Sequence, residues 1–155
     1  MLLSQRCEYA VRAALYLAAR DSASYIAVRE ISEALNIPRS FLAKTVQDLT
    51  SAGVFTSMRG PAGGLALARP ADRITVKEVV LAVDGADVFT ACVLGLPGCG
   101  DRTPCPLHDQ WVLARDRIHT MFASATLADT AALTQAGDFR LALNERSSAR
   151  SPATT

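Results

Sequence analysis

One stretch, residues 92–108, constrains this chain more than any other, because it can form neither a regular helix nor a strand. It is rich in glycine and proline, which break both kinds of element and let a loop curl, and it carries three of the four cysteines and one of the two histidines. Six residues separate Cys92 from Cys99, five separate Cys99 from Cys105, and two separate Cys105 from His108. A curled loop with thiols spaced in this way can point several sulfur atoms at one centre, as a metal ion or an iron–sulfur cluster requires.

Other chemistry is open to such a loop. Free cysteines are often no more than small buried hydrophobic residues, and a disulfide would require an oxidising compartment and would leave one of the loop thiols unpaired. A structural zinc site usually contains a tight Cys-x2-Cys knuckle, and the sequence contains none. Soft thiolate ligands at wide spacing therefore favour an iron–sulfur cluster, with zinc as the second choice.

The length of 155 residues suits one domain, or one small domain with an arm. Half of the residues are apolar but only 6% are aromatic, which predicts an adequate rather than a large core. We expect no transmembrane span. Glu8 and Arg12 interrupt the apolar N-terminal run and no clean cleavage site follows it. We therefore expect a mature helix rather than a signal peptide, and a cytoplasmic protein with reduced thiols.

Charge is distributed unevenly along the chain. The formal net charge is only +1, but residues 36–77 contain six basic side chains and two acidic ones, a local net charge of +4. The basic residues are Arg39, Lys44, Arg59, Arg69, Arg73 and Lys77. A basic segment beside a slightly acidic remainder indicates an electrostatic face that suits phosphate groups.

The N-terminal segment from about Ser4 to Arg20 has the pattern of an amphipathic helix. Its apolar stripe recurs at helical spacing and consists of Val11, Ala14, Leu15 and Ala18. Cys7 and Glu8 lie in the first turn, where the helix dipole favours the glutamate. We expect both on a surface or half-buried face.

Two further helices follow, over residues 28–35 and from Pro38 to about Ala52, with a short turn between them. Pro38 suits the first position of a helix and Gly53 suits its end. One face of the second helix is apolar and is expected to be buried; it consists of Leu42, Val46 and Leu49. The other face is polar and consists of Ser40, Lys44, Gln47 and Ser51, with Arg39 at its start. This arrangement is typical of a helix-turn-helix, although a pair of ordinary packed helices has the same pattern.

A glycine-rich hairpin is predicted directly after this pair. Residues 54–58 and 65–68 have the pattern of strands, and the turn between them begins Arg59-Gly60-Pro61. It is not a nucleotide-binding loop, because no Lys-Ser pair and no helix follow it. A hairpin in this place is the wing of a winged helix, in which glycines approach the sugar–phosphate backbone closely and Arg59 reaches a phosphate or the minor groove.

Helices are also predicted on both sides of the cysteine loop. A capping box formed by Thr75 and Glu78 starts a helix over residues 76–84. After the loop, a long helix over residues 107–125 has apolar positions spaced alternately by four and three, namely Leu107, Trp111, Ala114, Ile118, Met121 and Ala125. This spacing is typical of a coiled-coil seam, and a long seam in a small chain indicates pairing with a second copy.

The last part of the chain completes the expected organisation. Thr126 can cap a short final helix from Leu127 to about Leu133, and beyond Gly137 the chain is expected to fray. The expected fold class is mainly α with a small β-hairpin, a winged helix-turn-helix plus a long dimerisation helix. The expected parts are a DNA-binding domain over 1–84, a cluster-binding loop over 85–106, dimerisation and final helices over 107–134, and a flexible tail over 135–155.

The order of these elements resembles the IscR/NsrR (Rrf-two) family of bacterial winged-helix regulators over residues 1–133. The resemblance rests on the Tyr9-Ala-Val-Arg12 helix, the helix-turn-helix, the Arg-Gly-Pro-x-Gly-Gly wing, the Val-x-Glu-Val-Val helix, the three cysteines, the tryptophan-bearing long helix and the Thr-Leu-Ala-Asp end. It implies a homodimer that binds palindromic double-stranded promoter DNA. It also implies an iron–sulfur cluster in each subunit, whose state sets the affinity for DNA.

The resemblance also implies the cluster ligands. The three loop cysteines occupy the cysteine positions of the family, and His108 matches the histidine that is the fourth ligand in the iron–sulfur-assembly branch. In nitric-oxide-sensing relatives the fourth ligand is an N-terminal carboxylate from the other subunit, and Glu8 matches that position. Cys7 beside it is a third candidate. The first cysteine gap is six residues here and often five in the family, so the branch stays open, with a 2Fe-2S cluster favoured over 4Fe-4S.

We expect Ser40, Lys44 and Gln47 to face the major groove of DNA, with Lys44, Arg39 and Arg59 at phosphates or groove edges. An enzyme is not expected, because the remaining histidine, His119, lies on the long helix and no nucleophile–base pattern is visible. Two alternatives are kept: a cluster-free or zinc-bound DNA-binding dimer, and a small iron–sulfur redox protein.

Overall fold

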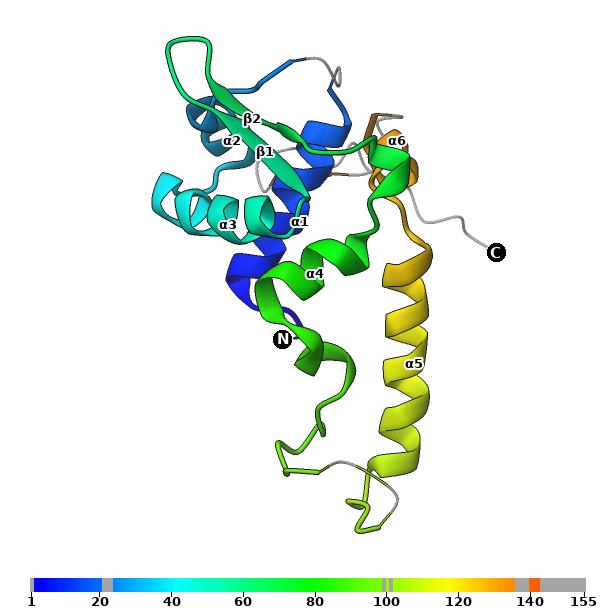
Figure 1. Ribbon diagram of the computed structural model, residues 1–155. Coiled ribbons are helices and arrows are strands. Elements are labelled where there is room, and N and C mark those ends of the chain that lie inside the picture. The colour runs from blue at the N-terminus through cyan, green and yellow to red at the C-terminus, as the bar shows by residue number, and fades with distance from the viewer. Residues whose placement is uncertain (1, 21–23, 99, 101, 136–139, 143–155) are drawn as a thin grey trace, which may run out of the picture.

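The computed structural model describes residues 2–20, 24–98, 100, 102–135 and 140–142. The elements in this part of the chain are α1 (Gln5–Ala18), α2 (Val28–Leu35), α3 (Arg39–Ser51), β1 (Phe55–Met58), β2 (Gly64–Leu67), η1 (Ala71–Arg73), α4 (Val76–Asp84), η2 (Ala86–Phe89), α5 (His108–Ser124) and α6 (Leu127–Gln135). The expected fold class is confirmed, because the described chain is mainly helical with one antiparallel hairpin. The hairpin and the cysteine loop lie at opposite ends of the molecule, and α5 stands beside the body (Figure 1).

Helix α1 lies at the centre of the body. The Ser4 side chain caps it by accepting the Cys7 backbone N–H at 3.1 Å. Its buried face carries Ala10, Ala13 and Ala14, each 0% exposed, and such small side chains allow α3, α4 and α6 to approach closely. The buried face of α1 is therefore centred on these alanines. Val11 and Ala18, which belong to the apolar stripe expected from the sequence, pack only at the edge of the core.

The two residues of interest in the first turn of α1 differ in exposure. Glu8 is half-buried, as expected. The expectation for Cys7 is wrong: its side chain is 0% exposed and belongs to the core. The reason is tertiary, because the last turn of α4 covers this face of α1 and Asp84 accepts hydrogen bonds from Ser4 N–H at 2.8 Å and Ser4 Oγ at 2.5 Å.

The predicted helix-turn-helix is present as α2 and α3. Helix α2 ends at Asn36 in the left-handed conformation, with φ of 52°. Pro38 is the N-cap of α3 and not its first residue, because its extended ψ of 134° turns the chain into the helix. The expected core face holds for Leu42 and Leu49, at 1% and 0% exposed, while Val46 lies at the edge of the core.

The predicted wing is the hairpin of β1 and β2, with Phe55 opposite Leu67 and Met58 opposite Gly64. The hairpin is joined to the body by a bridge that the sequence pattern does not reveal. Ile26 N–H donates to Leu65 O at 2.9 Å, and Leu65 N–H donates to Ile26 O at 2.8 Å. This bridge fixes where the wing leaves the body.

Gly64 should tolerate no side chain. A Cβ at this position would lie 2.2 Å from the Ile26 carbonyl oxygen, a backbone atom that cannot move without breaking the bridge to Leu65. We expect Gly64→Ala to destabilise the fold by about 2 kcal/mol, which lowers the midpoint of thermal unfolding by roughly 4–8 °C. Circular dichroism checks this, with Ala62→Ser in the exposed turn as the control. Equal midpoints for the two variants would show that the wing does not need this close approach.

Helix α4 starts as predicted and leads toward the cysteine loop. Thr75 Oγ1 accepts the Glu78 N–H at 3.3 Å, and Glu78 Oε2 accepts the Thr75 N–H at 2.8 Å, so the capping box is confirmed. Val79 and Val80 are 0% exposed and pack into the core. Past the end of α4 the short helix η2 begins the segment expected to be a loop.

Helix α6 returns to the body beside η1 and α1. Leu127 N–H donates to Ile74 O at 2.8 Å, and Val76 N–H donates to Ala125 O at 2.9 Å. Thr126 caps α6 as predicted, because its Oγ1 accepts the Asp129 N–H at 3.0 Å. The C-terminal end of α5 is therefore attached to the first residues of α4.

The expected flexible tail falls mostly outside the described residues. Within residues 140–142, Ala142 is 6% exposed, and the Leu141 carbonyl accepts a hydrogen bond from Arg12 Nε at 2.5 Å. This short part lies against the body. The expected boundaries at 84, 106 and 134 stay predictions.

Helix α5 buries no residue within the described chain. Leu107 and Met121 of the expected seam are 47% and 54% exposed, and Leu113 beside it is 62% exposed. Ala114 is exposed, and Trp111, Ile118 and Ala125 are half-buried. A long helix with an uncovered apolar surface agrees with the expectation of a second copy, which stays a prediction.

Candidate metal centre and nucleic-acid interface

Two of the loop cysteines come together although they are 13 positions apart in the sequence. The sulfur atoms of Cys92 and Cys105 are 3.6 Å apart. Cys92 is 7% exposed and Cys105 is half-buried. The third predicted ligand, Cys99, lies outside the described residues.

Turns at both ends of the loop bring this pair together. The Cys92 carbonyl accepts the N–H of Gly95 at 3.0 Å, and the Cys105 carbonyl accepts the N–H of His108 at 3.0 Å. Gly95 adopts a φ of 70°, which an L-residue rarely adopts. Because α5 begins at His108, the second cysteine is connected almost directly to the long helix.

The spacing of the two sulfur atoms fits a metal. Two thiolates on one tetrahedral metal with bonds of about 2.3 Å lie about 3.8 Å apart, close to the observed 3.6 Å. A disulfide would bring the two sulfur atoms to about 2.05 Å, so the separation of 3.6 Å excludes a disulfide between Cys92 and Cys105. Among the described residues no group of three metal-ligating side chains is complete. The pair therefore fits part of an iron–sulfur or zinc site.

The three candidates for a fourth ligand lie in different surroundings. His108 is half-buried at the first position of α5. Glu8 is half-buried on α1. Cys7 is enclosed in the core, where burial and then the negative charge of Asp84 raise the pKa of its thiol to about 12. A buried thiol that resists ionisation is a poor metal ligand, because the thiolate is the form that binds.

The raised pKa of Cys7 predicts selective labelling of the cluster-free protein. At pH 8 roughly 10⁻⁴ of a thiol with such a pKa is ionised, so iodoacetamide should modify Cys105 while leaving Cys7 intact. Addition of urea to unfold the chain should make Cys7 reactive. Mass spectrometry of tryptic peptides measures both, and rapid native-state labelling of Cys7 would contradict the burial described above.

Two side chains of α5, which the sequence pattern does not single out as site residues, hold the start of the cysteine loop. Trp111 Nε1 donates to the Ala91 carbonyl at 2.8 Å. Arg115 Nη1 donates to the Thr90 carbonyl at 2.9 Å. The sequence pattern predicts Trp111 only as a residue of the coiled-coil seam. Its role in holding the loop backbone is suggested in the sequence only by the indole N–H, which usually finds a hydrogen-bond partner when the ring is buried.

The predicted DNA-contacting residues of α3 all lie on its exposed surface, and they are Arg39, Ser40, Lys44 and Gln47. Arg39 forms an ion pair with Glu33 of α2 at 3.6 Å. The opposite face of α3 is anchored in the body, where Thr45 is 0% exposed and its Oγ1 donates to the Phe41 carbonyl at 2.8 Å. Helix α3 therefore presents its polar face from a fixed position.

The wing presents the other predicted contacts. Arg59, Gly60 and Pro61 are exposed in the turn between β1 and β2, and the Gly60 carbonyl accepts the Gly63 N–H at 2.9 Å. The turn projects from the body at the end opposite the cysteine loop (Figure 1).

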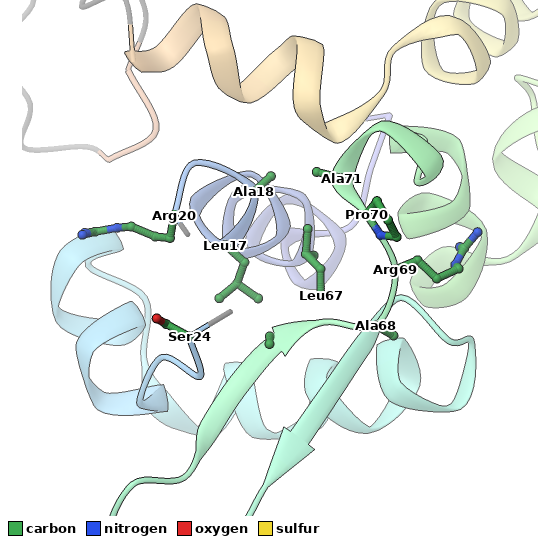
Figure 2. A pocket seen from close by; sticks show the side chains of 10 residues that line it. Leu17, Ala18, Arg20, Ser24, Leu67, Ala68, Arg69, Pro70 and Ala71 are labelled. Atoms are coloured by element: carbon green, nitrogen blue, oxygen red, sulfur yellow. The ribbon is translucent and has the colours of Figure 1, made fainter. Parts of the chain in front are cut away.

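A pocket of about 380 Å³ lies between the end of α1 and the link from β2 to η1 (Figure 2). Its floor is apolar and includes Leu17 and Leu67. Its two arginines already have partners: Arg20 contacts Tyr16, and Arg69 donates to Glu78 at 2.6 Å. We assign no ligand to it.

An exposed polar helix anchored beside a glycine-rich hairpin defines a winged-helix DNA-binding protein. The Rrf2 family, described as an iron-dependent transcriptional regulator, matches residues 3–132. The HTH-type transcriptional regulator IscR of Xenorhabdus nematophila is 35% identical over 129 residues, which cover 83% of this chain and 78% of that protein. This chain therefore belongs to the Rrf2 family of transcriptional regulators, and it is not an enzyme.

Solved structures share the fold. CymR, the global cysteine regulator of B. subtilis, superimposes with a TM-score of 0.70 at 24% identity and covers 84% of this chain and 96% of its own. IscR of T. potens gives a TM-score of 0.70 at 22% identity, with coverage of 89% and 91%. Across the described residues we find no helix with the length and apolar character that a membrane span requires.

Proposed function

We propose that this regulator is a homodimer whose affinity for palindromic promoter DNA depends on an iron–sulfur cluster in each subunit. Cys92, Cys99, Cys105 and a fourth residue would hold the cluster. The observation that carries the proposal is the approach of the Cys92 and Cys105 sulfur atoms to 3.6 Å at the base of α5. A regulator acts where the DNA is, so we place it in the bacterial cytoplasm, where thiols stay reduced.

We propose His108 as the fourth ligand. It follows Cys105 in the same turn, bonded backbone to backbone at 3.0 Å, so its side chain starts close to the cysteine pair. Glu8 is the alternative, supplied by the partner subunit. The burial of Cys7 in the core argues against the third candidate.

The cysteine pair supports a 2Fe-2S over a 4Fe-4S cluster. In the smaller cluster two cysteines share one iron, so their sulfur atoms lie about 3.8 Å apart, whereas in the larger cluster each cysteine binds its own iron. The separation of 3.6 Å between the two sulfur atoms suits a shared metal ion. A single zinc ion would satisfy the same pair, so the metal must be identified chemically.

The uncovered surface of α5 supports the dimer. Leu107, Leu113 and Met121 are each about half exposed or more in the single chain, and pairing with the same helix of a second copy would cover them. Two recognition helices related by a twofold axis read two inverted half-sites about 34 Å apart, or a multiple of that distance.

The connections of α5 suggest how the loop controls DNA binding. When bound, the cluster supplies iron–thiolate bonds that oxidation, nitric oxide or iron loss can break. Cys105 leads directly into α5, and the other end of α5 is bonded to Val76 through Ala125 at 2.9 Å. Release of the loop would therefore shift α5 against the body and change the spacing of the two recognition helices.

A visible absorption spectrum with iron and sulfide quantification on anaerobically purified protein tests the proposal. We expect cluster bands and stoichiometric iron and sulfide in the unmodified protein. His108→Ala should lose them if His108 is the fourth ligand, while Glu8→Ala should keep them; the reverse result assigns Glu8. A colourless protein that binds DNA with zinc or no metal would leave a regulator without a cluster.

A further inference from the structure

The backbone that precedes Cys92 is held by α5 through two side-chain hydrogen bonds. Trp111 Nε1 donates to the carbonyl of Ala91 at 2.8 Å, and Arg115 Nη1 donates to the carbonyl of Thr90 at 2.9 Å. The two donors are one helical turn apart, so they hydrogen-bond to the carbonyl groups of consecutive peptide units in the same segment. These two carbonyl groups belong to the two residues immediately before Cys92.

The same segment also packs on α5 through aromatic rings. Phe89 meets His119 edge to face, with ring centroids 5.3 Å apart, and meets Phe122 at 6.2 Å. Within the segment, the Asp87 carbonyl accepts the N–H of Thr90 at 3.2 Å and that of Ala91 at 2.8 Å. The end of η2 and the residues up to Ala91 are therefore a folded unit attached along α5.

The side chains become much more exposed directly after Cys92. Val93, Leu94 and Leu96 are 46%, 50% and 53% exposed, whereas Cys92 itself is 7% exposed. Arg115 is held at a cost, because its Nε is buried without a hydrogen-bond partner among the described residues.

We infer that Trp111 and Arg115 are positioning residues that lock Cys92 to α5, so that the first cysteine and the long helix move as one unit. The inference deepens the proposed function and rests on it for its meaning: Cys92 is the fixed ligand, and loss of the cluster frees the rest of the loop around it. The lock itself is a property of the chain and exists without a cluster.

The test compares two variants with a matched control. Trp111→Phe keeps an aromatic ring and removes the N–H donor, and Arg115→Gln removes the guanidinium. Arg117→Gln makes the same change at an exposed position of the same helix. In cluster-free full-length protein, the rate of Cys92 alkylation by iodoacetamide is measured by mass spectrometry, with Cys105 as the internal reference and thermal unfolding as the measure of global stability.

We expect Cys92 to react about fivefold faster in Trp111→Phe and in Arg115→Gln than in Arg117→Gln, the change that loss of one hydrogen bond produces. The Cys105 rate and the unfolding midpoint should stay close to those of the control. Equal Cys92 rates in all three proteins would overturn the inference. So would a parallel rise at Cys105 with a lower midpoint, since that indicates general loosening.

A second measurement separates this inference from the proposed function. In the cluster-loaded protein, the two variants should lose iron to a chelator about fivefold faster than the Arg117→Gln control. If the unmodified protein holds no cluster, the proposed function fails, and the alkylation rates still decide whether the lock exists. If the cluster is present and all three proteins lose iron at one rate, the proposed function stands and the lock does not act on the cluster.

Discussion

Replacement of Cys105 by serine should abolish the visible iron–sulfur absorption and reduce bound iron and sulfide more than about tenfold in protein purified without oxygen. The Cys105 sulfur lies 3.6 Å from that of Cys92, and a serine hydroxyl is a hard, weakly ionised group that replaces a soft thiolate poorly. Cys92→Ser should have the same effect, because the two thiols are proposed to bind the same metal ion.

The control for this pair is Cys7→Ala. It also removes one thiol, but that thiol is enclosed in the core and has a pKa raised to about 12 by burial and by Asp84. We therefore expect Cys7→Ala to retain iron and sulfide at the level of the unmodified protein. Stoichiometric cluster in Cys105→Ser, or its loss only in Cys7→Ala, would contradict the proposed ligand set.

Replacement of Lys44 or Arg59 by alanine should weaken binding to all DNA sequences by about tenfold at low salt. Both side chains are exposed, one on α3 and one at the wing, and each is expected to neutralise a phosphate. The slope of log affinity against log salt should therefore become shallower by about one for each phosphate that the variant no longer neutralises. Fluorescence anisotropy with a labelled duplex at several salt concentrations measures both quantities.

Two further variants show whether the effect is specific. Arg102→Ala removes the same charge from the cysteine loop, a segment that lies at the end of the molecule opposite the wing (Figure 1). This variant should leave the slope unchanged. Gln47→Ala should relax sequence preference without altering the slope, since a base-edge contact releases no counterion. An unchanged salt slope in Lys44→Ala and Arg59→Ala would rule out their phosphate contacts.

Much of the fold follows from local patterns in the sequence. The bounds of α2 and α4, the capping box at Thr75 and Glu78 and the cap at Thr126 are confirmed. These features depend on residues close together in the chain, where propensity, capping and periodicity act directly. The wing is of the same kind, because a glycine-rich turn between two short apolar runs predicts a hairpin by itself.

The features that the sequence does not reveal arise from contacts between distant segments. Cys7 is buried by α4, which lies far along the chain. The bridge from Ile26 to the wing likewise joins segments whose pairing no local pattern specifies.

The sequence predicts which thiols form the candidate site, and that ligand set stays a prediction, but it does not predict the side chains that hold the cysteine loop. Thiol spacing in a glycine- and proline-rich loop indicates a metal, and the structure brings Cys92 and Cys105 together. The hydrogen bonds from Trp111 and Arg115 depend on how α5 lies against the loop. The heptad-like spacing assigns Trp111 to a dimer seam. In the structure its indole N–H also donates to the backbone of the cysteine loop.

The most direct test of the central claim is a comparison of DNA affinity before and after removal of the cluster from the same preparation. A duplex enriched from a random pool by the loaded protein serves as the probe, and anisotropy at fixed salt gives both affinities. The proposed function predicts a change of about tenfold or more and inverted half-sites spaced by about 34 Å or a multiple of it. Equal affinities for the loaded and cluster-free dimers would contradict it and leave a regulator that binds DNA independently of its cysteine loop.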